Sequence, residues 1–398
     1  MGVYSRRVYI GRHSRSNGNC NKLAAPKLRR TVVIEPVAVW NRLSGLTLTG
    51  YKSIAECKLE MGRLNILIGA NGAGKSNFIG FFKLIGRMLD GQLQTAVGEA
   101  GGPDAMLHFG RKTTEQLGSE IYLGNNGYRF KLAPTQDNRL MYAFEALWRN
   151  THGAWRPASG HFETYVEEQA SHTGIYNDIV PAMRSWRVYH FHDTGGSARV
   201  KQIHGINDNR YLRDDARNLA AFLYRLQRRH PEHYRRIVKT IGLAAPFFGD
   251  FHLRPSVDNP EKIQLEWTES GQDIPFPAGA LSDGTLRFIC LATVLLQPEQ
   301  YMPASILVDE PELGLHPYAV NVLAALMKSV AERRQLIVST QSVELVNEFQ
   351  AQDLIVVDKL GGTSTFKRLN ETKLQPWLED YSLGELWKKN LLGGRPNR

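Results

Sequence analysis

Two short segments, far apart in the chain, contain the residue types that bind and cleave nucleoside triphosphates. Residues 69–76 read GANGAGKS and fit the pattern G-x-x-x-x-G-K-S of a phosphate-binding loop, or P-loop. In such a loop, backbone N–H groups surround the phosphates, and the N-terminus of the following helix adds partial positive charge. We expect Lys75 to reach the β- and γ-phosphates of ATP and Ser76 to ligate Mg²⁺. The residues expected to contact ATP here are Asn71, Gly72, Ala73, Gly74, Lys75, Ser76 and Asn77.

The second segment, residues 305–312, reads SILVDEPE and places carboxylates at the end of an apolar run. Asp309 stands where a carboxylate on the magnesium side of the site belongs, and Glu310 is placed to act as general base toward the attacking water. An acidic pair alone is weak evidence, because many strands end in solvated carboxylates. In a chain that also has a P-loop, the pair predicts a magnesium-dependent ATPase.

Buried strands and amphipathic helices must position these segments. The apolar run 64–68 predicts a buried strand that leads directly into the P-loop, and residues 77–89 predict a helix after it. Residues 284–296 predict a second helix. The runs 336–340 and 353–357 predict further buried strands. This alternation of strands and helices indicates an α/β nucleotide-binding domain.

The regions around these elements divide the chain into four predicted segments. Residues 46–51 and 55–59 alternate like paired strands, and residues 119–147 predict a β-meander. No heptad pattern of coiled-coil length occurs between the P-loop and the acidic strand, so we expect a compact insertion there. The segments are a basic arm (1–41), an N-terminal ATPase lobe with P-loop and β-meander (42–149), a helical insertion (150–260) and a C-terminal ATPase lobe (261–398).

Longer motifs make the chain resemble one group of ATPases. Residues 309–317 read DEPELGLHP, and the sequence LTGYKSI at 48–54 precedes NILIGANGAGKS at 65–76. These motifs resemble RecF-like, SMC-related AAA-type ATPases of the ABC-ATPase class, over about 42–110 and 260–398. The resemblance implies an α/β P-loop NTPase with a mixed sheet, a β-meander lobe and a compact helical insertion. It also implies binding of ATP and Mg²⁺ between two heads, and roles in DNA repair, chromosome maintenance or anti-phage defence.

The resemblance assigns further residues to the site. Residues 281–285, LSDGT, match the signature loop, in which Ser282 and Gly284 would complete the site of a partner head. Taken alone, this sequence also fits an N-cap for the next helix. Residues 312–317 would lie at the dimer interface. Gln341 stands where the group has a switch histidine; a glutamine can hydrogen-bond a phosphate or water but cannot carry positive charge, which predicts slow hydrolysis.

Charge and cysteine content limit the environment of the protein. The net charge is +10, and most of it lies in residues 1–41 and 201–240. The arm fits either a phosphate-binding segment or a solvated tail. The three cysteines show no metal-ligand spacing and favour a reducing compartment, which we expect to be the cytoplasm. No run of eighteen apolar residues occurs, so no membrane span is expected.

The basic region at 212–229 is the only sequence hint of a polymer partner. If it is one helix, its arginines lie opposite an apolar stripe, and a double-stranded DNA backbone could contact that face. A solvated helix face is the alternative. The residues proposed for DNA contact are Arg213, Arg217 and Arg228.

Two hypotheses for the role of the ATPase follow. The first is a DNA-associated ATPase in repair or anti-phage defence, which assembles with itself as a homodimer or larger oligomer. The second is an ATP-gated scaffold that holds or regulates an effector protein such as a toxin or nuclease; it is motivated by Gln341. The nucleotide domain of a transporter fits less well, because of the long insertion and residues 312–317.

Overall fold

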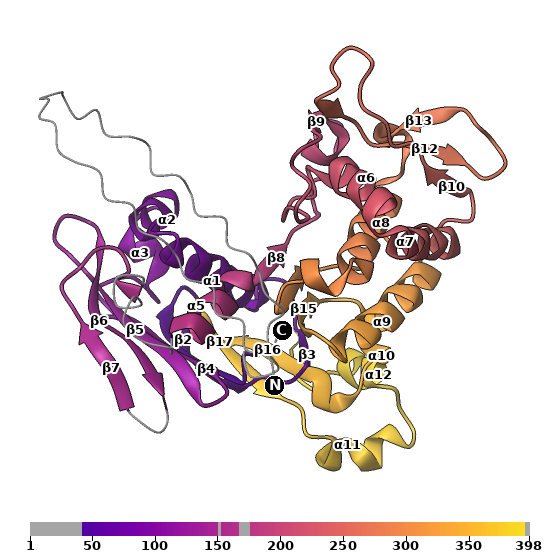
Figure 1. The fold of residues 1–398 in the computed structure, drawn as a ribbon. Coiled ribbons are helices and arrows are strands. Elements are labelled where there is room, and N and C mark those ends of the chain that lie inside the picture. Colours follow the sequence, from indigo (N-terminus) through magenta and orange to yellow (C-terminus); the bar gives the residue numbers. More distant parts are fainter. Residues whose placement is uncertain (1–41, 150–152, 167–175, 395–398) are drawn as a thin grey trace, which may run out of the picture. The chain divides into compact units, whose positions relative to one another are not determined.

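The computed structural model describes residues 42–149, 153–166 and 176–394, all within the compact unit 34–398 (Figure 1). The predicted basic arm 1–41 lies outside the described residues. Two large sheets dominate the described part, one mostly parallel and one antiparallel. No helix in this part of the chain is long and apolar enough to cross a membrane.

The first sheet has six strands and carries the P-loop and the acidic segment. Five strands run parallel, and β17 pairs with β16 antiparallel at one edge. Four of the parallel strands are buried along most of their length, as expected for a sheet covered on both faces. In sheet order the strands are β17 (Thr363–Arg368), β16 (Leu354–Leu360), β3 (Leu64–Ile68), β15 (Gln335–Thr340), β14 (Ser305–Asp309) and β8 (Arg187–Tyr189).

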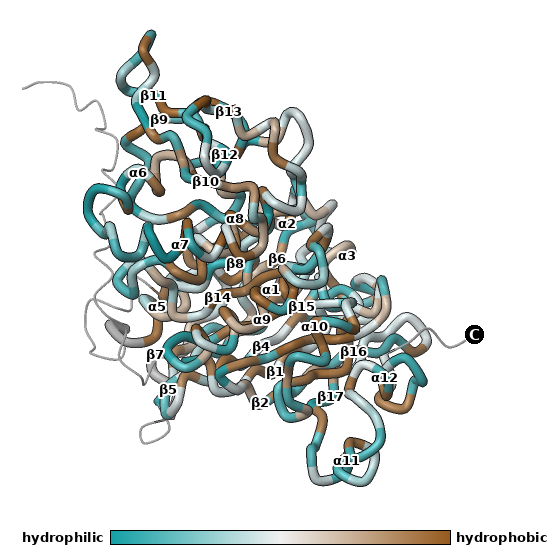
Figure 2. Tube along the Cα trace, turned by 90° about the vertical axis from the view of Figure 1, so that its right-hand side faces the viewer, coloured by the Kyte–Doolittle hydropathy of each residue, from teal (hydrophilic) through white to brown (hydrophobic). Residues whose placement is uncertain are grey.

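Successive residues of these strands point into two different cores, as the twofold period of a strand requires. Ile66 and Ile306 belong to one core, together with the helices α6 to α10 and α12. Leu67 and Leu307 belong to the other, together with α1 and the antiparallel sheet. Figure 2 shows hydrophobic residues concentrated along these central strands. The helices of the first core are α6 (Leu219–Arg229), α7 (Pro231–Ala244), α8 (Asp283–Leu296), α9 (Pro317–Ala331), α10 (Val343–Asn347) and α12 (Leu383–Lys388).

The second sheet is wholly antiparallel and contains the predicted β-meander. Phe81 of α1 (Lys75–Leu89) packs against Tyr51 and Phe130 of this sheet and so joins the P-loop helix to it. Its strands, in sheet order, are β2 (Ile54–Glu60), β1 (Gly45–Tyr51), β4 (Leu117–Leu123), β5 (Asn126–Pro134), β6 (Leu140–Arg149) and β7 (Gly153–Ala158). The short helices α2 (Leu93–Glu99), α3 (Pro103–Met106) and α5 (Tyr176–Ser185) accompany it in sequence.

Residues 150–260, predicted as a helical insertion, also contribute strands to both large sheets. β7 extends the antiparallel sheet, and β8 is the edge strand beside β14. The predicted segment 150–260 thus shares sheets with the segments on either side of it, and the predicted division into lobes remains a prediction. Two small sheets lie nearby in sequence: β10 (Phe248–Phe251), β12 (Glu266–Glu269) and β13 (Pro275–Pro277) form one, and β9 (His204–Gly205) and β11 (Lys262–Ile263) form the other. The helix α11 (Glu371–Leu378), near the C-terminal end, has no buried residue.

Candidate nucleotide-binding site

The P-loop connects β3 to α1, as the sequence predicts. Asn71, Gly72 and Ser76 are exposed, so the loop has an open side toward solvent. Gly74 has a φ of 119°, and a Cβ there would lie 2.1 Å from Ser364 Oγ. Only glycine fits this conformation and this close approach. Ser364 in turn donates a hydrogen bond of 2.5 Å to Ala73 O, so β17 supports the loop from behind.

Lys75 is the first residue of α1, and its side chain is buried under the loop. Its Nζ donates to Gly69 O at 2.7 Å and to Ala70 O at 3.0 Å. Burial lowers the pKa of Lys75, and the carboxylates of Glu310, Asp309 and Glu312 oppose this shift. The lysine therefore lies within electrostatic reach of the acidic segment, although the two motifs are far apart in sequence.

Asp309 is the last residue of β14 and is buried beside β15. It is in register with Ser339, whose hydroxyl donates a hydrogen bond to its Oδ1. The carboxylate is thus fixed at the carboxyl end of the parallel sheet, where ligands bind in open α/β folds.

Glu310 follows in a left-handed conformation, with a φ of 45°. Its N–H donates to Ser339 O at 2.9 Å, and its side chain accepts a hydrogen bond from Gln341 Nε2. A left-handed backbone at a bulky residue is costly and is found preferentially at functional sites. The structure thus brings the predicted general base and the predicted switch residue into direct contact.

Glu312 has a role in the site that the sequence did not reveal. Its Oε1 accepts three hydrogen bonds: from Thr340 Oγ1 at 2.5 Å, Gln341 N at 3.0 Å and Ser342 N at 3.2 Å. Its Oε2 is shielded from solvent without a hydrogen-bond partner among the described residues. Burial raises the pKa of Glu312, and the nearby Glu310 adds to this shift. Glu312 therefore holds the backbone of the switch segment in place.

The predicted signature loop lies at the start of α8. Ser282 caps this helix by accepting a hydrogen bond from Thr285 N at 3.2 Å, so the N-cap interpretation is confirmed. Gly284 packs on residue 314: a Cβ on Gly284 would lie 2.0 Å from Gly314 O. The signature loop therefore touches the segment 312–317 of its own chain, while Ser282 stays exposed.

Arg287 and His192 join this loop to the acidic strand. The Arg287 guanidinium donates to Phe191 O, His192 O and Leu313 O at 2.8–3.0 Å. His192 Nε2 donates to Asp309 O at 2.9 Å. The segment after β8 is thus part of the site.

The residues of the site fit a magnesium ion bound with a nucleotide. Mg²⁺ uses one or two protein oxygens together with phosphate oxygens and water. The Ser76 hydroxyl is exposed beside the P-loop, and the Asp309 carboxylate lies at the strand end. No group of three or more His, Cys, Asp or Glu residues in the described ranges forms a self-sufficient metal site. The donor set therefore suits a metal that arrives with the nucleotide.

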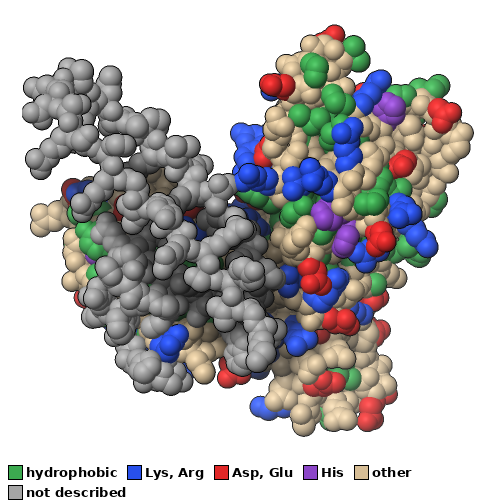
Figure 3. Space-filling model, in the orientation of Figure 1, with side chains coloured by type: hydrophobic (Ala, Val, Ile, Leu, Met, Phe, Trp, Pro, Cys, Tyr) green, Lys and Arg blue, Asp and Glu red, His purple; other side chains and the backbone are tan. Residues whose placement is uncertain are grey.

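The predicted basic helix at 212–229 is wrong in its first part. α6 begins at Leu219, and Ala216 before it has a left-handed φ of 54°. Figure 3 shows Lys and Arg side chains gathered around the segment that leads into α6. Two of the predicted DNA-contacting arginines belong to this segment, and neither lies on the helix.

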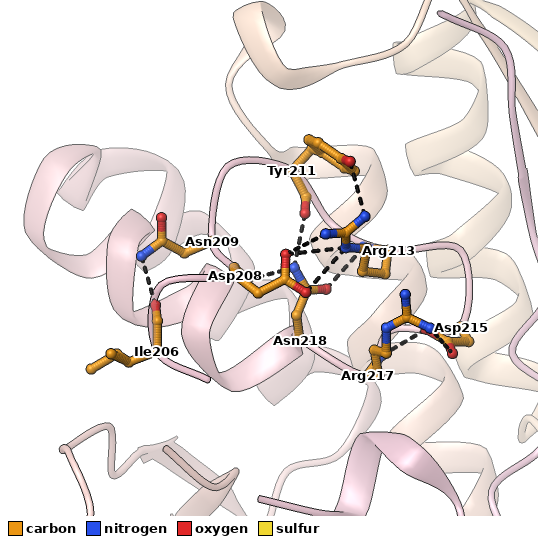
Figure 4. A network of polar contacts seen from close by, with 8 residues as sticks. All are labelled: Ile206, Asp208, Asn209, Tyr211, Arg213, Asp215, Arg217 and Asn218. Carbon is orange, nitrogen blue, oxygen red and sulfur yellow. Dashed lines mark hydrogen bonds and ion pairs between the residues drawn. The ribbon is translucent and has the colours of Figure 1, made fainter. Parts of the chain in front are cut away.

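These two arginines are held by neighbouring carboxylates (Figure 4). Arg213 binds Asp208 through Nε and Nη2 at 2.8–3.1 Å, and Arg217 binds Asp215 at 3.2 Å. Arg228 does lie on α6, is exposed, and stacks over the ring of Tyr224 at 4.3 Å. A single arginine face along one helix therefore does not exist, and DNA contact by these residues stays a prediction.

Comparison with known proteins places this geometry in a family. Residues 64–347 match the family described as "AAA domain, putative AbiEii toxin, Type IV TA system". This match spans the P-loop, the signature loop, the acidic strand and Gln341. No curated protein matches the chain.

Solved structures of similar fold are SMC head domains. A crystal structure of an Smc head bound to the C-winged helix domain of ScpA shares 19% identity, with a TM-score of 0.57, over 84% of this chain and 99% of that one. An Smc head with an extended coiled coil from Pyrococcus furiosus shares 18% identity, with a TM-score of 0.53, over 85% and 99%. An Smc head from Pyrococcus yayanosii shares 14%, with a TM-score of 0.51, over 85% and 99%. These matches confirm the predicted fold class.

Proposed function

Since this chain belongs to that AAA-domain family and has the fold of SMC-type P-loop ATPases, we propose that it binds ATP with Mg²⁺ and hydrolyses it at the site described above. The contact between Glu310 and Gln341, at the end of the strand beside Asp309, is the observation that carries this proposal. In the proposed complex, this carboxylate and this amide face the γ-phosphate together with the P-loop lysine.

Each side chain has a distinct task in this reaction. Glu310 accepts a proton from the attacking water, and Gln341 orients that carboxylate or the water by hydrogen bonding. Lys75 transfers its hydrogen bonds from the loop carbonyls to the phosphate oxygens. Ser76 and Asp309 would hold Mg²⁺, which neutralises phosphate charge. Because Gln341 carries no positive charge, turnover is slow.

We also propose that two copies bind head to head, with Ser282 and Gly284 of one copy facing the nucleotide of the other. The support is the position of this loop on the protein surface beside residues 312–317. Leu313 and Tyr318, next to it, expose 43% and 54% of their surface, which suits an interface. A homodimer or larger oligomer would then form only with ATP bound.

The first candidate role is DNA-associated work in repair or anti-phage defence. It is supported by the Lys and Arg residues before and on α6, of which Arg228 is exposed. A backbone contact of this kind requires only clustered positive charge.

The second candidate role is an ATP-gated scaffold that holds or regulates an effector protein. Two observations favour it. Gln341 suits a slow ATPase that acts through binding, and the name of the family refers to a toxin–antitoxin system. In this role, DNA has no direct effect on turnover.

Steady-state ATP hydrolysis with and without double-stranded DNA tests the hydrolytic site and the two candidate roles, with the Glu310→Gln variant as the inactive control. Turnover that vanishes in this variant supports the hydrolytic site, and equal turnover in both proteins contradicts it. Stimulation by DNA that is lost in Arg228→Ala favours the first role. Turnover that is indifferent to DNA favours the scaffold.

A further inference from the structure

Lys201 places an ammonium group beside the signature loop of its own chain. It is the last residue of the 3-10 helix η2 (Arg199–Lys201), and its Nζ lies 3.7 Å from Asp283 Oδ1. Asp283 stands between Ser282 and Gly284, the two residues proposed to face the nucleotide of a second copy. Lys201 is far from this loop in the sequence, so the fold alone brings the two together.

Packing fixes η2 against the segment that precedes the signature loop. Ala198 and Val200 are buried in the first core, together with Ala278. The 3-10 helix η3 (Ala278–Ala280) leads into the signature loop and contacts η2. The backbone N–H of Lys201 donates a hydrogen bond of 3.0 Å to Ala198 O. The position of Lys201 is therefore set by the same core that carries the signature loop.

The ammonium group of Lys201 has unused hydrogen-bonding capacity. The Lys201 side chain is only 10% exposed, whereas that of Asp283 is 59% exposed. The distance of 3.7 Å between them is too long for a hydrogen bond, and Lys201 Nζ donates none to any other residue of the described ranges. An ammonium group has three N–H donors, and a largely buried charge needs partners. These free donors point to an anionic ligand that arrives from outside the chain.

The charge on Asp283 makes a cation necessary at this place. A carboxylate between two residues that face a γ-phosphate repels that phosphate, because both groups are anions. The dipoles of α8 offset only part of this repulsion, since the N-terminus of a helix carries about half a positive charge. Lys201 supplies a full positive charge next to the same carboxylate.

The segment that ends at Lys201 also reaches the nucleotide site of its own chain. It begins after β8 with His192, which is bonded to Asp309 O at 2.9 Å. Thr194 is buried, and its Oγ1 accepts a hydrogen bond of 3.4 Å from Arg287 Nη2. Arg287 belongs to α8, at whose start the signature loop lies. This segment therefore connects the acidic strand with the loop that would face a second copy.

We propose that Lys201 donates a hydrogen bond to the γ-phosphate of ATP bound to a second copy of this chain, next to Ser282 and Gly284. This inference rests on the head-to-head dimer proposed above, and it adds a residue from outside the signature loop to the site. In this arrangement, Asp283 holds the ammonium group in place before the partner arrives. ADP has no γ-phosphate to accept the bond, so Lys201 stabilises only the dimer with ATP.

Sedimentation velocity of the full chain with ATP and Mg²⁺ tests the proposal, in the Glu310→Gln parent protein, which should keep ATP uncleaved. A hydrogen bond to a charged group is worth about tenfold in affinity, and a twofold symmetric dimer has two such contacts. Lys201→Met should therefore weaken dimerisation about a hundredfold, while the monomer binds ATP as before. Lys201→Arg should recover most of this loss, since a guanidinium also donates to phosphate oxygens.

Lys328→Met is the matched control. It removes the lysine of an ion pair of 3.5 Å with Glu348, which is close to the distance between Lys201 and Asp283. This pair lies at the end of α9 away from the segment 312–317. The control should change neither dimerisation nor the binding of ATP by the monomer.

A double variant separates a phosphate contact from simple neutralisation of Asp283. Asp283→Asn should dimerise at least as well as the parent protein, because it removes a negative charge near the phosphate. Lys201→Met combined with Asp283→Asn should stay weak, because the contact with the phosphate is still missing. Dimerisation of the double variant at the parent level would overturn the proposal, and so would a Lys201→Met single variant that dimerises as the parent does.

Failure of the underlying dimer gives a different result. If the parent protein binds ATP but stays monomeric at every concentration, the head-to-head dimer and the role of Lys201 fail together. If only the Lys201 variants behave as the parent does, the dimer stands and the inference alone fails. Urea unfolding shows whether Lys201→Met is folded. If it is not, Lys201→Gln, which lacks the charge but keeps a polar end, replaces it.

Discussion

The backbone N–H of Ala70, inside the P-loop, donates a hydrogen bond of 2.6 Å to the carbonyl oxygen of Gly394 near the end of the described chain. Gly394 N donates to Asp358 Oδ1 at 2.7 Å, and a Cβ on Gly394 would lie 3.3 Å from the Cα of Gly69. The same segment begins at α12, where Gly384 N bonds Asn347 Oδ1 at 2.7 Å in α10. The C-terminal segment therefore contacts both the P-loop and the helix that follows Gln341.

Removal of residues 393–398 should weaken ATP binding about fivefold, because the P-loop loses a backbone hydrogen bond of roughly 1 kcal/mol. Titration with ATP measures the change. A shorter truncation that removes 395–398 keeps Gly394 and is the control, for which wild-type affinity is expected. Identical affinities for both truncations and the wild type would show that this contact does not support the loop.

Glu312→Gln should make stability less dependent on pH. Burial raises the pKa of Glu312 above its usual value near 4.5. A group whose pKa is raised by folding stabilises the folded state, and this stabilisation is complete at pH values below the unfolded-state pKa. It is lost as the pH rises through the folded-state pKa. Relative to Glu312→Gln, the wild type should therefore lose stability as the pH rises above about 4.5. Urea unfolding of both proteins across this range measures the difference.

Glu312→Ala should be destabilising at every pH. It leaves the backbone N–H of Gln341 without its acceptor, which costs on the order of 1–3 kcal/mol, whereas the N–H of Ser342 keeps Thr340 Oγ1 as an acceptor at 3.0 Å. Unfolding curves that superimpose on those of Glu312→Gln would mean that the three hydrogen bonds contribute little.

Local patterns were sufficient to predict the strand before the P-loop, the helix after it and the acidic strand. Leu64–Ile68 is buried throughout and Lys75–Leu89 is amphipathic, so periodicity alone identifies both. The structure places both motifs on strands that flank β15, which is why Lys75 and Glu310 interact. The role of Glu312 depends on the pairing of β14 with β15, and no local sequence pattern predicts this role.

The start of α6 could not be found in the same way. Residues 212–218 continue the helical period, but tertiary hydrogen bonds hold them as a loop. Asn218 Nδ2 donates to Asp208 O at 2.7 Å and to Tyr211 O at 2.9 Å. No Gly or Pro marks this loop, although Asp214, Asp215 and Asn218 are residue types that favour turns.

Gln341→His should raise the turnover number several-fold and make it pH-dependent. An imidazole at this position can bond Glu310 and the γ-phosphate as glutamine does, and it adds positive charge when protonated. With a pKa near 6.5, the gain should be largest below neutral pH. Turnover measured from pH 5.5 to 8.5 at saturating ATP tests this expectation. A histidine variant no faster than the wild type at any pH would show that Gln341 does not limit hydrolysis.

Arg213→Ala should lower stability, whereas Arg228→Ala should leave it unchanged. Arg213 makes a bidentate contact with Asp208 and a hydrogen bond of 2.9 Å to Tyr211 OH, and its side chain is 32% exposed. After allowance for solvent screening, the loss is about 1 kcal/mol. Arg228 is exposed and lies over the ring of Tyr224 on its own helix. Urea unfolding measures both variants. If Arg213→Ala is as stable as the wild type and also weakens DNA binding, this arginine serves as a DNA contact after all, and its pairing with Asp208 is incidental to the fold.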